Sequence, residues 1–327
     1  MNDMNDYRVV ALLKNGKALD LTDALESLKW EDNEGELAQR AVIALAQVQT
    51  AYGLLSSVIE LCSTIYIYGN GSEVMRGIVW EWQYTSSSQN KFQVLVYDKM
   101  IYLQKSKDNF YFASGRLTKS ILTEICNKWN IKLSYKWGNY KHGKLVYKGK
   151  TIAKSILDTL DEVKKKTGKR YVAKFSKDTL IIDFPGTNKY MYIISSENGN
   201  AIATDHTQTM DKMITRVVIT GKDTSKGKIP VVATVNGNRN YGCLQDLVSS
   251  SSTSTSEAKE EANAKIKEYG SPENVIKVEA VDVPEIRKGD VVNVVAGSLN
   301  GDYFVLSISH DADGQTMSMK LEKAVAS

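Results

Sequence analysis

Short runs of alternating apolar and polar residues dominate this 327-residue chain, most clearly near its end. Three such runs cover residues 286–295, 302–311 and 317–322, and their β-branched and aromatic alternation predicts a strand for each. Asn300-Gly301 and Asp313-Gly314 separate the runs, and such dipeptides supply the positive φ values of tight turns. The pattern predicts an antiparallel meander, which needs further strands to be stable.

The first hundred residues show a similar β pattern. Apolar residues at helical spacing between Tyr52 and Cys62 predict one short helix. One helix among several strands favours a closed or nearly closed barrel, because closure removes exposed sheet edges. The predicted strands cover residues 7–13, 28–34, 38–46, 64–68, 74–84 and 92–97, with turns at Asn15-Gly16 and Gly69-Asn70-Gly71. The alanines and leucine of residues 38–46 would also suit a helix.

A mixed pattern of helices and strands follows. Apolar residues at helical spacing predict a helix from Leu117 to Trp129. A second helix is predicted between an N-cap at Thr151 and a glycine past its end, Gly168. Strands are predicted at 171–175 and 179–184, so this region reads as a small α+β domain.

The β pattern returns after residue 203, with predicted strands at 213–220 and 229–235. A Ser/Thr run at 249–256 predicts an exposed loop, and the capping box Ser254-x-x-Glu257 predicts a helix at 257–269. We therefore predict a mainly β fold with an α+β insert. The expected domains are a β-barrel at 1–98, a basic α+β insert at 99–203, and a second β-barrel at 204–327 that contains helix 257–269.

Composition narrows the class of protein. The chain is 42% hydrophobic and 24% charged, as is typical of soluble globular proteins. It has no run of about 18 apolar residues and no charged-then-apolar leader, so neither membrane insertion nor secretion is expected. Cys62, Cys126 and Cys243 are odd in number and lie among apolar neighbours, which predicts free core cysteines in a reducing compartment.

Candidate catalytic residues are few. The three histidines, His142, His206 and His310, are too dispersed to indicate a metal site. Asp205-His206 and His310-Asp311 could orient an imidazole as a general base, but adjacent strand residues point to opposite faces of a sheet. We predict no enzyme activity and no catalytic, cofactor-binding or metal site.

Two loops resemble ligand-binding motifs without matching them. Residues 221–228 resemble a phosphate loop, but five residues separate the glycines where the motif has four. Asp311-x-Asp313-Gly314 resembles the start of a calcium loop, but its glycine comes too early. Both are predicted to be turns.

Positive charge is concentrated between Lys128 and Lys177. This segment has fourteen lysines and one arginine but only three acids, so its net charge is +12. Because the whole chain has a net charge of +4, the rest of the chain carries −8. Aromatic residues lie among these charges. Three interpretations stay open: a solvated surface, docking to an acidic protein partner, or binding of nucleic acid or an anionic wall polymer. The candidate partner-binding residues are Lys164, Lys165, Lys166, Lys169 and Arg170.

Short motifs between residues 286 and 321, in a fixed order, indicate a family for this chain. Together with helix 257–262 after its Ser/Thr loop and the segment 117–133, they resemble the corresponding parts of baseplate hub proteins of contractile phage tails. These include the hubs of PBSX-type prophages and of phage-tail-like bacteriocins. The motifs are Ile286-x-x-Gly289-Asp290-x-Val292, Leu299-Asn300-Gly301-x-Tyr303-x-Val305-x-x-Ile308-x-His310 and Met317-x-Met319-x-Leu321.

This resemblance implies a structural role and a homotrimer. Each subunit would carry two tail-tube-like barrels, so that three copies form a pseudo-sixfold ring joining a hexameric inner tube to a trimeric central spike. Implied partners are the inner tube or a tube-initiator protein, the central spike and baseplate wedge proteins, without membrane or nucleic acid. The particle would assemble in the bacterial cytoplasm. A cell-wall-binding or wall-degrading tail protein is the alternative, although no fused wall-degrading domain is expected because nothing follows Ser327.

Overall fold

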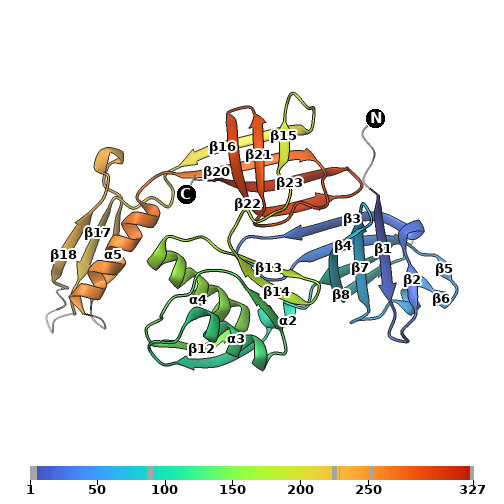
Figure 1. The fold of residues 1–327 in the computed structure, drawn as a ribbon, viewed down its shortest axis with the longest axis horizontal. Coiled ribbons are helices and arrows are strands. Elements are labelled where there is room, and N and C mark those ends of the chain that lie inside the picture. Colours follow the sequence, from blue (N-terminus) through green and yellow to red (C-terminus); the bar gives the residue numbers. More distant parts are fainter. Residues whose placement is uncertain (1–5, 87–90, 223–226, 228, 251–253, 325–327) are drawn as a thin grey trace. The chain divides into compact units, whose positions relative to one another are not determined.

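The computed structural model describes residues 6–86, 91–222, 227, 229–250 and 254–324. The fold is mostly β, with 49% strand and 19% helix, which confirms the predicted mainly β class. The chain forms two compact units, one from residues 1–204 and 277–327 and the other from residues 205–276. Figure 1 shows the elements of both units, which are described separately below.

Strands from both ends of the chain form one thirteen-stranded sheet in the first unit (Figure 1). The two sets meet where β3 pairs antiparallel with β22, from Asp32 opposite Ile308 to Lys29 opposite Asp311. The N-terminal strands are β1 Tyr7–Leu12, β2 Ala18–Asp20, β3 Leu25–Asp32, β4 Arg40–Ala46, β7 Thr64–Gly69, β8 Ser72–Thr85 and β9 Lys91–Tyr97. The C-terminal strands are β15 Tyr192–Ser195, β16 Ala201–Thr209, β20 Glu273–Val281, β21 Val291–Ala296, β22 Leu299–Asp311 and β23 Thr316–Lys323.

The N-terminal strands follow the predicted alternation, with every second side chain in a buried core. Gly16 (φ 81°) confirms the turn after β1, and Asn70 (φ 50°) with Gly71 (φ 75°) confirms the β7–β8 hairpin. The helix predicted between Tyr52 and Cys62 is much shorter than expected. Helix α1 covers only Leu55–Val58, because the chain becomes extended at Ile59; β5 Gln49–Thr50, β6 Gly53–Leu54 and the 3₁₀ turn η1 Thr22–Ala24 complete this part.

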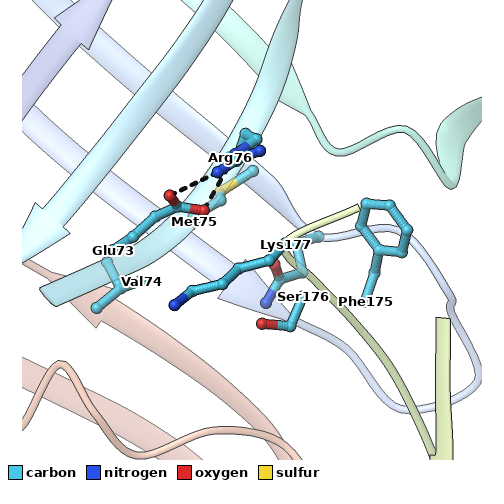
Figure 2. A pocket seen from close by; sticks show the side chains of 8 residues that line it. Glu73, Val74, Met75, Arg76, Phe175, Ser176 and Lys177 are labelled. Atoms are coloured by element: carbon cyan, nitrogen blue, oxygen red, sulfur yellow. Dashed lines mark hydrogen bonds and ion pairs between the residues drawn. The ribbon is translucent and has the colours of Figure 1, made fainter. Parts of the chain in front are cut away.

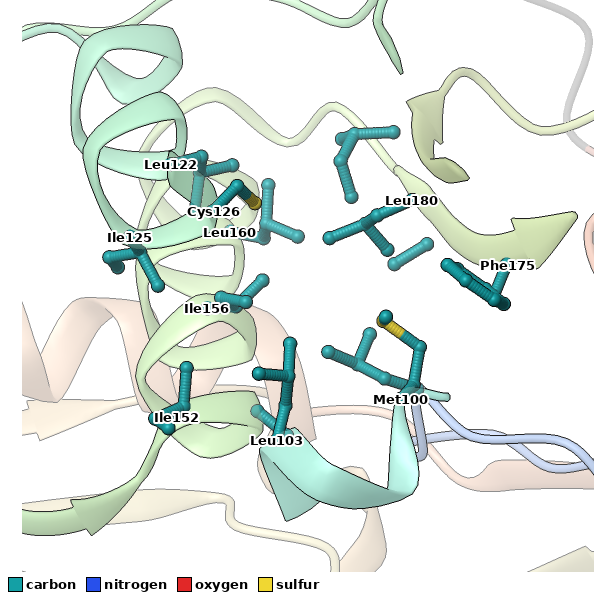
Figure 3. Close-up of a cluster of buried hydrophobic side chains, with 14 of the residues drawn as sticks. Met100, Leu103, Leu122, Ile125, Cys126, Ile152, Ile156, Leu160, Phe175 and Leu180 are labelled. Atoms are coloured by element: carbon teal, nitrogen blue, oxygen red, sulfur yellow. The ribbon is translucent and has the colours of Figure 1, made fainter. Parts of the chain in front are cut away.

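The insert forms a separate core around two helices (Figure 3). Both predicted helices are confirmed. Thr151 caps α4 by accepting a hydrogen bond from the Lys154 amide (3.2 Å), and Gly168 ends it in the left-handed region (φ 71°). The elements are α2 Ile101–Lys105, β10 Lys107–Phe112, α3 Thr118–Lys128, β11 Lys132–Tyr135, β12 Leu145–Thr151, α4 Ile152–Thr167, β13 Val172–Ser176 and β14 Thr179–Asp183.

The terminal meander is confirmed, but one of its turns lies elsewhere. Asn300 and Gly301 are part of β22, where they pair with β21, so the turn prediction for them is wrong. The chain reverses at Gly297-Ser298 instead, because Gly297 adopts the left-handed conformation (φ 58°). The first strand also begins later than predicted, at Val291. The turn at Asp313-Gly314 is confirmed, and the Gly314 amide donates to Oδ1 of Asp311 (3.1 Å).

Gly289 lies where the loop before β21 meets the insert. Its φ is 89°, and a Cβ at this position would overlap both methyl groups of Val172 on β13. Gly289→Ala is therefore expected to lower the free energy of unfolding by about 2–3 kcal/mol, from backbone strain and overpacking. Urea unfolding measures the change. Gly143→Ala is the control, since a Cβ there meets nothing within 4 Å; equal losses for the two variants would contradict the prediction.

The second unit is a three-stranded sheet covered by one helix. Ala258 and Ala262 of the helix pack on Val217, Ile219 and Val248 of the sheet. The predicted capping box is present, with Ser254 and Glu257 bonded reciprocally. The elements are β17 Arg216–Thr220, β18 Val231–Asn236, the 3₁₀ turn η2 Arg239–Tyr241, β19 Gln245–Ser249 and α5 Thr255–Tyr269.

Within the second unit, helix α5 packs on β17–β19. The division into domains 1–98, 99–203 and 204–327 stays a prediction. Parts of two predicted loops, residues 223–226 and 228 and residues 251–253, lie outside the described residues, as does the start of the chain at 1–5.

Candidate functional site

A buried polar cluster lies where the N-terminal and C-terminal strands meet. We call Tyr7, Trp30, Asp282 and His310 the junction cluster. The His310 ring stacks on Trp30 with centroids 3.9 Å apart and planes 7° from parallel. Its Nδ1 lies 2.6 Å from Oδ1 of Asp282, and Tyr7 donates its hydroxyl proton to Oδ2 of Asp282 (2.6 Å). Its Nε2 lies 3.2 Å from the carbonyl oxygen of Ile286.

The junction cluster is closed to solvent. The side chains of His310 and Asp282 are both 0% exposed. Burial lowers the pKa of His310 while its contact with Asp282 opposes the shift, and burial together with the Asp282 charge raises the pKa of Tyr7. A general base must reach its substrate within hydrogen-bonding distance, and no substrate reaches side chains that are closed to solvent. The contacts of the junction cluster instead join the N-terminal strands to the C-terminal strands.

The neighbour of His310 in sequence is not its partner. Asp311 points to the other face of β22 and pairs with Lys29 (2.7 Å). This confirms that adjacent strand residues cannot form the His-Asp pair considered from sequence.

A buried lysine forms a second link between the two sets of strands. Lys288 is only 7% exposed, and its Nζ lies 2.6 Å from Oδ1 of the buried Asp32. The same ammonium group donates to the carbonyl oxygens of Asn33 (3.0 Å) and Glu36 (2.8 Å). Beside it, Arg287 donates to the Val74 carbonyl oxygen (2.9 Å). The ion pair with Asp32 and the two hydrogen bonds to carbonyl oxygens compensate for the burial of the Lys288 ammonium group.

Asp98 is a third buried carboxyl group in this unit. Its oxygens accept hydrogen bonds from the backbone amides of Gln39 (2.9 Å) and Met100 (2.8 Å). Burial nevertheless raises its pKa to about 7. Between about pH 4 and pH 7 the folded chain therefore binds a proton that the unfolded chain has released. The stabilisation from this proton is complete below about pH 4 and is lost as the pH rises through 7.

Asp98→Asn should remove this pH dependence. We expect wild-type stability to fall by about 2–3 kcal/mol between pH 5 and pH 8 through Asp98, and the variant to lack this decrease. The variant is expected to be less stable at low pH, because its amide group would face one of the two backbone N–H donors. Urea unfolding across this pH range measures the effect, with the exposed Asp211→Asn as control. An unchanged profile in Asp98→Asn would contradict the assignment.

The remaining histidines and cysteines occupy varied sites. His142 is buried, with Nε2 2.9 Å from Thr118 Oγ1 and Nδ1 3.0 Å from Glu162 Oε2, whereas His206 is exposed. Cys126 is buried, and burial raises its pKa to about 12. The core prediction is wrong for the other two cysteines, Cys62 and Cys243, because both lie in exposed loops despite apolar neighbours. In the described part of the chain, no three His, Cys, Asp or Glu side chains gather as metal ligands would.

The predicted basic residues do not form a single site. Lys164, Lys165 and Lys166 are exposed in the last turn of α4, where positive charge suits the helix dipole. Lys169 is exposed beyond the helix. Arg170 instead pairs with Glu322 of β23, and its carbonyl oxygen accepts a hydrogen bond from Trp137 Nε1 (2.8 Å). Arg170 thus connects the insert to the meander, while the lysines stay candidates for partner binding.

A small pocket lies between β8 and the β13–β14 hairpin (Figure 2). Its empty volume is about 260 Å³ even with open solvent included, below the usual 300–1,000 Å³ of ligand sites. Arg76 in its wall forms two hydrogen bonds with Glu73 (3.1 and 2.8 Å) and one with Asp178 (2.7 Å). Lys99 also pairs with Asp178 (2.8 Å). These paired charges indicate a contact that holds the hairpin in place.

Sequence reasoning missed Asp32, Asp98, Asp282 and Lys288. One signal was available for Asp32, which continues the inward series Leu28, Trp30 along β3 and so places a carboxylate at a core position. The same signal was available for Asp98, which continues the buried series of β9, and for Asp282, which continues that of β20. Lys288 lies in a loop, where no alternation marks it. None of the helices in the described residues has the length and apolar character needed to cross a membrane.

Several solved tail proteins have a similar fold. The 43 kDa tail protein of prophage MuSo2 from Shewanella oneidensis is 13% identical, with a TM-score of 0.70 over 97% of this chain and 98% of that one. A tail protein from Neisseria meningitidis MC58 is 12% identical, with a TM-score of 0.71 over 97% and 96%. The prophage tail protein gp18 from Listeria monocytogenes is 12% identical, with a TM-score of 0.56 over 98% and 96%.

At these identities the similarity establishes the fold. No curated protein matches the chain in sequence. The sequence itself provides the family, because a family model described as YQBQ-like matches residues 28–323, most of the chain. The chain therefore belongs to the YQBQ-like family.

Proposed function

We propose that this protein is a structural subunit of a phage-tail baseplate, where it forms the hub of the particle. The observation that carries the proposal is the similarity of fold to two tail proteins, one of them from a prophage, over nearly the whole length of both chains. The joined sheet supports it, since a subunit that bears mechanical load needs its two sets of strands fixed to each other. Lys288 and the junction cluster supply such links inside the first unit.

In the proposed assembly, three copies form a ring between the tail tube and the central spike. Its partners would be the inner tube or a tube-initiator protein, the spike and the baseplate wedge proteins. The role is structural rather than enzymatic, and the finished ring is part of a virion or of a tail-like particle assembled in the cytoplasm. Closed cyclic symmetry is the usual state of such homo-oligomers.

Light scattering combined with size-exclusion chromatography tests the ring directly. The expected particle has three times the subunit mass of 36.4 kDa. Electron micrographs of tails carrying a tagged copy should place the chain at the tube end near the spike. A protein that stays monomeric and never enters tail particles would refute the proposal. Release of muropeptides from purified cell walls would instead favour a wall-degrading role.

A further inference from the structure

The two-stranded sheet β10–β12 has one buried face and one open face. Phe110, Phe112 and Tyr147 point into the core of the insert. On the opposite face, Tyr111 and Val146 lie directly across from each other in the strand register. They are 65% and 43% exposed, so this cross-strand pair forms an apolar surface in contact with solvent.

Lysines surround this apolar pair. Lys107 lies on the same face of β10 as Tyr111, and Lys148 lies on the same face of β12 as Val146; both are exposed. The acid of these strands, Asp108, is turned away and pairs with Lys128 (2.6 Å). We call Lys107, Tyr111, Val146 and Lys148 the Tyr111 platform. A tyrosine in an apolar centre with a charged rim is the composition of a protein interface.

The charge of the chain itself points to the occupant. Residues 99–203 contain 21 Lys and Arg against eight Asp and Glu, whereas residues 1–98 contain seven against thirteen, of which only Asp32 and Asp98 are buried among the residues that the structure describes. A head-to-tail ring requires two different and complementary surfaces on one subunit, which this charge separation provides. Single-stranded nucleic acid would instead need several exposed aromatic rings along a basic groove, and the platform has one.

We propose that the Tyr111 platform binds the acidic N-terminal strands of a second copy of this chain. The inference rests on the proposed ring and identifies the surface through which neighbouring subunits recognise each other. Tyr111 and Val146 lose solvent contact in this interface, while Lys107 and Lys148 pair with carboxylates of the neighbour. The interface is heterologous, so each subunit offers the platform on one side and acidic groups on the other.

The test compares two variants with the same change of charge in the same insert. Lys107→Glu/Lys148→Glu alters the platform, and the control Lys119→Glu/Lys132→Glu alters two exposed lysines elsewhere in the insert. All four side chains are exposed, so circular dichroism should show wild-type folding for both. By sedimentation velocity, self-association of the platform variant should be at least about tenfold weaker than that of the wild type, and the control should match the wild type. Wild-type association should weaken between about 0.1 and 0.5 M NaCl.

Mixing the proteins provides a stricter criterion. The platform variant keeps its acidic surface, so it should bind the platform of one wild-type subunit and stop ring closure, giving heterodimers. Tyr111→Ser, which leaves the charges intact, should also weaken association.

The possible failures are distinguishable. Trimers of the platform variant as stable as those of the wild type would overturn this inference and leave the proposed hub intact. A wild-type protein that is monomeric at every concentration would refute both. An oligothymidylate of about 20 nucleotides that binds the wild type but not the platform variant, with self-association unchanged, would overturn the inference in favour of nucleic acid.

Discussion

Replacing His310 with alanine is expected to lower the free energy of unfolding by about 3–5 kcal/mol. The change removes the ring stacked on Trp30 and leaves a cavity between β3 and β22. It also leaves the buried Asp282 carboxylate with Tyr7 but without its imidazole partner. Urea unfolding followed by tryptophan fluorescence measures the loss, and His206→Ala provides the control, because exposed substitutions usually change stability by less than about 0.5 kcal/mol.

A double variant separates the two causes. If the stranded carboxylate accounts for much of the loss, His310→Ala/Asp282→Ala should be more stable than the sum of the two single changes predicts, with a coupling of about 1–3 kcal/mol. A loss below about 1 kcal/mol in His310→Ala would show that the junction cluster does not hold the two sets of strands together.

Lys288→Met is the second change with a large expected effect. Methionine fills nearly the same space but removes the positive charge beside Asp32, which is 1% exposed, and leaves two carbonyl oxygens without their donor. Removing one partner of a buried ion pair typically costs about 3–5 kcal/mol, and we expect a loss in this range. Equilibrium unfolding in urea measures it.

Lys320→Met is the matched control for this change. Lys320 also pairs with an acid of the β3–β4 region, Glu34 (2.7 Å), but both side chains are well exposed to solvent. Exposed ion pairs contribute about 0–1 kcal/mol, so the control should lose no more than that. Equal losses in the two variants would mean that burial of Lys288 has no special importance, with Arg287 (Nη2 3.9 Å from Asp32) supplying the charge instead.

Local signals in the sequence predicted most of the individual elements. Helix α4 was found with both of its ends, because Thr151 and Gly168 act on their immediate neighbours. The error at Asn300-Gly301 has a local cause as well. Two turn-forming sites lie four residues apart, and Gly297 takes the left-handed conformation first, so the chain has already reversed when it reaches Asn300.

The links between distant segments could not be predicted in this way. Alternation along β22 places His310 in the core, but it cannot show that Asp282 and Trp30 contact it. The platform was missed for a related reason. Its two strands, β10 and β12, were not predicted, and Tyr111 and Val146 become neighbours only through their pairing.

The pairing of β3 with β22 also affects how the chain is made. Residues Lys29 to Asp32 can pair only after residues Ile308 to Asp311 have been synthesised. Only β23 of this sheet is synthesised later than β22. At about 5–20 residues per second, the edge of β3 stays unpaired for roughly 15–60 s during synthesis. An unpaired edge of this kind attracts other strands, so the nascent subunit is most vulnerable to aggregation before its C-terminal strands appear.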